Sequence, residues 1–171
     1  MGNSKSLDLN LYEIRIDSNF INNKSIIETY LYECQCAIFL VDITNDDSFA
    51  LIKDLLKVIN LDIFPYLKII LVQNKLDLDE TRLVQSFEIE EFLEDNKFLD
   101  RQEISLKNGN NVKDLMKKIN TYVNETKNEL SCNIVSESID RIEDTTKLQG
   151  YLDFILIGDT TIGKSCFLKD I

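Results

Sequence analysis

The stretch that most constrains the fold is GDTTIGKS, residues 158–165, because this pattern needs a particular backbone on either side of it. GxxxxGK[ST] is typical of a phosphate-binding loop, in which glycines let successive N–H groups turn toward phosphates at a helix N-terminus. Such a loop follows a buried strand, and the apolar run LDFILI supplies one at 152–157. We therefore predict a strand, a phosphate loop and a helix over residues 151–171.

Different residues of this loop are expected to contact different parts of the ligand. Lys164 would reach the terminal phosphates, and the hydroxyl of Ser165 would bind Mg²⁺. Thr161 would add a bulky side chain close to the phosphates. The predicted phosphate-binding residues are Gly158, Asp159, Thr160, Thr161, Ile162, Gly163, Lys164, Ser165 and Cys166.

The rest of the chain alternates strand and helix patterns, which predicts an α/β fold with a parallel sheet and helices on both faces, three layers in all. Strands are predicted over residues 7–16, 36–43, 67–73, 101–106 and 152–157. Helices are predicted over residues 22–34, 48–59, 87–96 and 111–130. Asp46 and Asp47 stand where they would cap the second of these helices. Residues 131–150 are polar and acidic, so we interpret them as a linker inside a single domain.

Composition excludes several classes of function. The net charge of -11 opposes nucleic acid or an anionic membrane surface as the main partner. The chain has no histidine, which removes Ser-His and Cys-His catalysis. Its 4 cysteines form no CxxC pair, so we expect free thiols of a cytoplasmic protein.

The N-terminal tip, residues 1–6, reads MGNSKS and matches the signal for N-myristoylation at Gly2. The alternative is a chance polar start, and the sequence supports both equally. One myristoyl chain gives only marginal, reversible membrane contact. An acylated form would therefore sit peripherally on the cytosolic face of a membrane.

A second motif, NKLD at residues 74–77, follows a buried strand. Ligands of open parallel sheets bind at the C-terminal ends of strands, which is where this motif is placed. The carboxylate of Asp77 would accept from two N–H donors on one edge of guanine, a pair that adenine does not offer. A solvated loop is the alternative for so short a motif.

The next strand ends in EISLKNGNNV, residues 103–112, which resembles the ETSAKTGENV segment of Ras-like small GTPases. CAIFLVDITNDDSFALIKDLL, residues 36–56, is similar to the AAILVYDITNEESFENVKRWL of the Rab branch. The resemblance covers nearly all of the chain outside the linker and the tip. It implies a P-loop G domain over 7–130, completed by 151–171, with GDP or GTP and Mg²⁺ as ligands.

The resemblance also assigns the residues around the base. Asn74 and Asp77 would hold guanine, and Lys75 would lie along the nucleotide. The backbone of Ser105, Leu106 and Lys107 would meet the base oxygen. Leu106 stands where the family usually has alanine, so its larger side chain is expected to crowd the base.

The order of the motifs departs from the family. There the phosphate loop comes first, whereas this chain begins at the equivalent of strand three and supplies strand one last, so it looks circularly permuted. In the family's sheet, strand one lies between strands three and four, and we expect 152–157 to fill that central place. A tandem protein cut after the start of a second domain is the rival interpretation, with strand one swapped from a neighbouring molecule.

The parts that sense the terminal phosphate are missing from this pattern. Edge strand two and switch I, with its Mg²⁺-binding threonine, are absent. Aligned without gaps, Ile16, Asn19 and Phe20 stand at the aspartate, glycine and glutamine of switch II, and a shift of one residue recovers Asp17 alone. We therefore expect little or no GTP hydrolysis, and no catalytic residue is assigned.

Three functions remain open at this point. The first is a Rab-like protein that binds guanine nucleotide without effective hydrolysis. The second is a pseudo-GTPase scaffold whose site is empty or holds nucleotide only for stability. The third is a competent GTPase whose switches come from a partner chain. The sequence names no protein partner.

Overall fold

The computed structural model describes residues 8–17, 21, 23–137, 151–159 and 162–167. The strands are β1 (Asp8–Arg15), β2 (Cys36–Asp42), β3 (Lys68–Asn74), β4 (Asp100–Glu103) and β5 (Tyr151–Gly158). The helices are α1 (Lys24–Glu33), α2 (Asp46–Val58), α3 (Ser86–Glu94), α4 (Val112–Glu137) and α5 (Lys164–Phe167). Two 3-10 helices, η2 (Leu61–Ile63) and η3 (Leu76–Thr81), flank β3.

The five strands form one parallel sheet in the order β1-β5-β2-β3-β4. The last strand in the chain, β5, therefore lies between the first two, as the sequence predicts. It pairs with all of β1, from Asp8 to Arg15, and with Cys36–Phe39 of β2. Phe154 to Ile157 are buried, which explains why this strand is continuously apolar.

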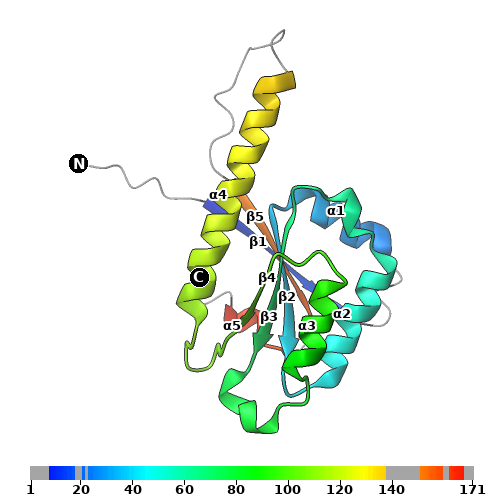
Figure 1. The fold of residues 1–171 in the computed structure, drawn as a ribbon, viewed down its shortest axis with the longest axis vertical. Coiled ribbons are helices and arrows are strands. Elements are labelled where there is room, and N and C mark those ends of the chain that lie inside the picture. The colour runs from blue at the N-terminus through cyan, green and yellow to red at the C-terminus, as the bar shows by residue number, and fades with distance from the viewer. Residues whose placement is uncertain (1–7, 18–20, 22, 138–150, 160–161, 168–171) are drawn as a thin grey trace, which may run out of the picture.

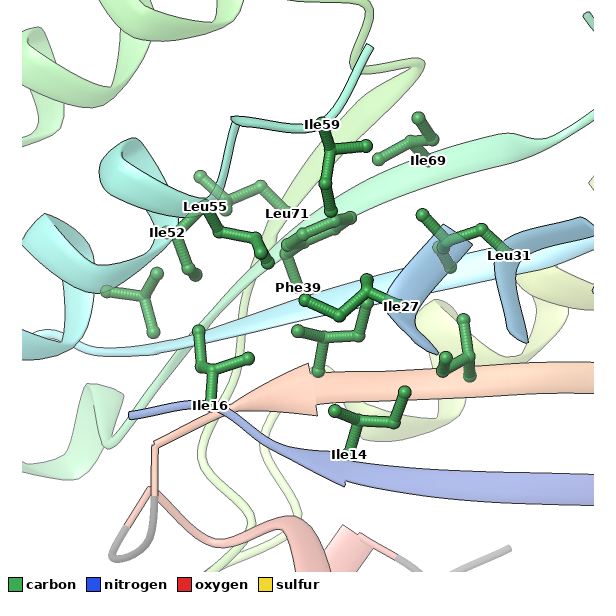
Figure 2. Close-up of a cluster of buried hydrophobic side chains, with 14 of the residues drawn as sticks. Ile14, Ile16, Ile27, Leu31, Phe39, Ile52, Leu55, Ile59, Ile69 and Leu71 are labelled. Carbon is green, nitrogen blue, oxygen red and sulfur yellow. The ribbon is translucent and has the colours of Figure 1, made fainter. Parts of the chain in front are cut away.

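Helices cover both faces of the sheet and give three layers (Figure 1). One apolar core lies under α1, α2 and α3, with Phe39 of β2 at its centre (Figure 2). The second core lies under α4 and α5 and includes Leu115, Ile119 and Phe167. The two cores take alternate residues of the central strands, because successive side chains of a strand point to opposite faces.

Two details of the helices differ from the prediction. Asn45, rather than Asp46 or Asp47, caps α2, because its side chain accepts from the Asp47 N–H at 3.1 Å. The two aspartates lie in the first turn, where their charge favours the positive end of the helix dipole. Helix α4 continues to Glu137, into the segment predicted as a linker from residue 131.

Candidate functional site

Asn74, at the end of β3, links the two predicted motifs through its side chain. Its Nδ2 donates to the carbonyl of Ile162 in the phosphate loop, at 2.7 Å. Its Oδ1 accepts from the N–H of Leu106, which follows β4, at 3.1 Å. Asn74 is buried, and each polar atom of its side chain has a hydrogen-bond partner, as the burial of polar groups requires. The NKLD, SLK and phosphate-loop segments therefore meet at one edge of the sheet.

Asp77 lies next to the segment that follows β4. Ser105 Oγ donates to Asp77 Oδ1 at 2.5 Å, and Lys107 Nζ lies 3.5 Å from Oδ2. The hydroxyl of Ser105 is the main reason that the pKa of the Asp77 carboxyl is lowered, with Lys107 acting in the same direction. The carboxylate is thus ionised at neutral pH, as acceptance from two N–H donors requires.

Lys75 has a left-handed backbone, with φ 72°, which is uncommon for a residue other than glycine. Its Nζ lies 2.5 Å from Oδ2 of Asp42, a buried carboxylate at the end of β2. The other oxygen of Asp42 accepts from the N–H and the hydroxyl of Thr44. Asp42 therefore fixes the lysine of the NKLD motif, a partnership that the sequence analysis missed. The only sequence signal for this ion pair is an aspartate at the C-terminal end of the neighbouring strand.

The glycines of the phosphate loop lie where side chains do not fit. A Cβ at Gly158 would lie 2.1 Å from the Ile162 side chain and 2.9 Å from the Leu40 carbonyl. Gly163 has φ 97°, and a Cβ there would lie 2.7 Å from Asn74 Nδ2 and 3.2 Å from the Leu106 side chain. The glycines of the pattern thus fit a tight turn against the guanine-side motif.

Lys164 is 2% exposed and turned into its own loop. Its Nζ donates to the carbonyl of Gly158 at 3.0 Å and to that of Asp159. Burial lowers the pKa of the Lys164 ammonium, and nearby Arg15 adds to this effect. Glu13 of β1 opposes the shift, with its Oε1 3.8 Å from Nζ. The ammonium is therefore held at the loop, beside a carboxylate that sequence reasoning did not identify.

Leu106 lies beside the loop, because its Cδ1 is the apolar atom nearest to a Cβ built at Gly163. Its side chain is half-buried. The side chain thus lies next to Gly163 of the phosphate loop, and the predicted crowding of the base stays a prediction. Its amide, which the resemblance assigns to the base oxygen, donates to Asn74.

The structure describes only some of the remaining predicted residues. Cys166 is exposed, and its N–H donates to the Gly163 carbonyl at 3.0 Å. Ile16, which the ungapped alignment places at the switch II aspartate, is fully buried in the core. Gly2, Asn19, Phe20, Thr160, Thr161 and the side chain of Ser165 lie outside the described residues.

The described ranges hold neither a metal-binding cluster nor a membrane-spanning helix. No group of three or more Cys, Asp or Glu side chains there is arranged to hold a metal ion. No helix among the same residues has the length and apolar character needed to cross a membrane. Cys36 and Cys166 are free thiols, as predicted for these two.

The parallel α/β sheet, with a phosphate loop beside NKLD and SLK, is the fold of a P-loop GTPase domain. The family model of the Ras family matches residues 21–125, more than half of the 171 residues. The chain belongs to the Ras family. The matched range holds β2 to β4 with both guanine-side segments, and it ends before β5. Members of this family are small GTPases that bind guanine nucleotide and Mg²⁺.

Proposed function

We propose that this protein is a Rab-like guanine-nucleotide-binding protein with degenerate switches and little or no GTP hydrolysis. The observation that carries the proposal is the double contact of Asn74, which joins the phosphate loop to the segment after β4. A site for base and phosphates together needs these segments in contact. The side-chain amide of Asn74 is buried with both polar atoms hydrogen-bonded, which supports that arrangement.

The residues present fit a guanine nucleotide. Asp77 would accept from the base, helped by an ionised carboxylate that Ser105 and Lys107 stabilise. Lys75 would lie along the nucleotide, positioned by Asp42. Lys164 would bind the phosphates, and Ser165 would bind Mg²⁺, which supplies charge neutralisation there.

The order of the chain is proposed to be a circular permutation of the family's domain, without edge strand two and switch I. The support is the place of β5, a buried central strand that comes last in the chain. It pairs with both β1 and β2. A strand swapped from a neighbouring molecule would give the same sheet, so the swapped arrangement stays the rival interpretation.

Weak hydrolysis is proposed because a water-positioning switch has no counterpart in the sequence. The ungapped alignment puts Ile16 at the switch II aspartate, and Ile16 is buried among apolar side chains. An apolar residue there offers no ligand to water or Mg²⁺. A shift of one residue would put Asp17 there instead.

The alternative function is a pseudo-GTPase that acts as a scaffold. It is favoured by Lys164, whose ammonium already donates to two loop carbonyls. Leu106, which lies next to Gly163, favours it too. The two contacts of Lys164 use two of the three N–H donors of its ammonium, which leaves one for a phosphate.

A binding experiment separates the two functions. The purified chain is denatured, released nucleotide is identified by chromatography, and uptake of GDP and ADP with Mg²⁺ is measured by calorimetry. We expect about one GDP per chain and no binding of ADP. Asp77→Asn should weaken GDP about tenfold to 100-fold, because a charged acceptor of two hydrogen bonds is lost.

Asp79→Asn is the matched control, since Asp79 lies on the same 3-10 helix but is 61% exposed and pairs with Arg82. Its GDP affinity should equal that of the wild type. An empty protein that takes up no GDP would overturn the nucleotide-binding proposal in favour of the scaffold. Turnover of GTP at ordinary small-GTPase rates would contradict both.

Gly2 is proposed as an acylation site on its motif alone, with weak contact to the cytosolic face of a membrane. Mass spectrometry of the protein from eukaryotic cells checks this, with Gly2→Ala as the unmodified control.

A further inference from the structure

Glu13 of β1 places a carboxylate beside the lysine of the phosphate loop. Its Oε1 lies 3.8 Å from Lys164 Nζ, which is an ion-pair distance. Lys164 is 2% exposed, so the carboxylate meets an ammonium that has little contact with solvent. The phosphate-loop pattern itself assigns no role to an acidic residue on a neighbouring strand. Glu13 is therefore an additional charge at the phosphate end of the site.

The pairing of β1 with β5 fixes the face of the sheet on which Glu13 lies. Arg15 pairs with Gly158, the first residue of the loop. Ile14 and Ile16 point into the core under α1 and α2 (Figure 2). Successive side chains of a strand point to opposite faces, so Glu13 and Arg15 lie on the face that carries α5 and the loop. The strand pairing thus holds the Glu13 carboxylate at the loop.

The position of Lys164 limits how far a bound phosphate can be from this carboxylate. The ammonium donates to two loop carbonyls, which leaves one N–H for a phosphate oxygen. A charge-assisted hydrogen bond to that oxygen is about 2.8 Å long. The oxygen would therefore lie within about 7 Å of Glu13 Oε1, and two negative charges at that separation repel each other.

The charges around Lys164 leave Glu13 without a counterweight. Burial lowers the pKa of the Lys164 ammonium, whereas among the nearby charged groups Glu13 and Asp159 raise this pKa and Arg15 lowers it. Asp159 and Arg15 carry opposite charges, so Glu13 offsets the charge of Lys164 itself. The four groups together carry no net charge, although this end of the site has to bind phosphate anions.

We propose that Glu13 is a specificity-determining residue that makes this site favour GDP over GTP. The lysine of a phosphate loop reaches the β- and γ-phosphates, so the additional phosphate of GTP adds negative charge at the end where Glu13 lies. The repulsion therefore acts on both nucleotides and more strongly on GTP. This inference rests on the proposed function, because it requires a guanine nucleotide at the loop.

The test is the ratio of the GDP and GTP affinities, measured by calorimetry on the full chain with Mg²⁺. Chromatography checks that the GTP stays intact during the measurement. The wild type should bind GDP about tenfold more tightly than GTP. Glu13→Gln keeps the size of the side chain and removes its charge. It should tighten GDP about threefold and GTP about tenfold or more, so that the preference becomes smaller.

Two further variants separate charge from structure. Glu13→Asp keeps the charge on a side chain that is shorter by one methylene, so it should keep a GDP preference within about threefold of that of the wild type. Glu94→Gln is the matched control, because Glu94 is exposed on α3, which covers the other face of the sheet. It removes the same charge from the molecule and should leave both affinities unchanged.

The outcomes distinguish this inference from the proposed function. A wild type that binds GTP as tightly as GDP, or a GDP preference that Glu13→Gln leaves unchanged, would refute the role of Glu13 and leave nucleotide binding intact. If neither the wild type nor Glu13→Gln binds either nucleotide, both proposals fail. Repeating the titrations without Mg²⁺ gives one more outcome. A loss of affinity in Glu13→Gln that is seen only with Mg²⁺ would make Glu13 a metal ligand and refute the competition with phosphate.

Discussion

At the scale of the residue, the side chain of Asn74 uses both of its polar atoms between distant parts of the chain. The contact with Ile162 spans 88 residues of sequence, and that with Leu106 spans 32. Neither contact is visible in a local pattern. The motif NKLD predicts a polar residue at the end of β3, but only the fold shows that its partner is the phosphate loop.

Gly163 is the position where the loop depends on this contact, and it gives a prediction. Gly163→Ala should lower the free energy of unfolding by about 2–4 kcal/mol, from left-handed backbone strain together with displacement of Asn74. Gly109→Ala is the control, because Gly109 has φ 77° but open space around its Cβ position. It should cost about 1–2 kcal/mol from backbone strain alone. Urea denaturation measures both, and equal costs would contradict the predicted clash.

The residues that the sequence analysis missed are partners of residues that it found. Asp42 holds Lys75, and Glu13 lies near Lys164. Both acidic residues lie on strands, whereas Lys75 follows β3 and Lys164 begins α5, so each pair joins two different elements. The sequence predicts the lysines, because a spacing motif marks them, but the pairing depends on how the strands are ordered in the sheet.

At the scale of the element, β2, β3 and β5 follow directly from their sequence. Each is a run of apolar residues that the structure buries. Strands covered on both faces have no polar alternation, so the run itself is the signal. The cap of α2 and the end of α4 were predicted less well. Asn45 and the two aspartates after it are all good capping residues, and the polar sequence after residue 130 hides the helix that continues to Glu137.

The central place of β5 gives a prediction for this element. Leu156 is fully buried in the core under α4 and α5, so Leu156→Ala should destabilise the protein by about 2–5 kcal/mol. Leu83→Ala removes the same atoms from a side chain that is 56% exposed, and it should change stability by less than about 0.5 kcal/mol. Thermal and urea unfolding of both variants check this. A small effect at Leu156 would mean that β5 is not part of the stable core.

At the scale of the whole molecule, the order of the strands in the chain differs from their order in the sheet. Residues 151–171 carry β5 and the phosphate loop, while the guanine-side segments precede them by many residues. If the order is a permutation, the position of this piece along the chain should be exchangeable.

A reordered variant tests this. It places residues 151–171 first, then a flexible linker, then residues 8–137. A Gly/Ser linker of about 20 residues has a root-mean-square span near 25 Å, about the length of a strand of eight residues. We expect cooperative unfolding and the same GDP affinity as in the original order. A variant with a scrambled β5 sequence is the control, and it should not fold. Loss of folding in the reordered variant with β5 intact would contradict the permutation.

The position of β5 after the other strands in the sequence also affects how the protein folds during synthesis. During synthesis, β1 to β4 and both guanine-side segments leave the ribosome before the strand that separates β1 from β2. The middle of the sheet stays open until then, and contacts such as Asn74 with Ile162 belong to the slow, long-range class. A bound nucleotide would span the early and late parts of the chain. Full nucleotide binding would therefore be limited to molecules in which the phosphate loop has already been translated.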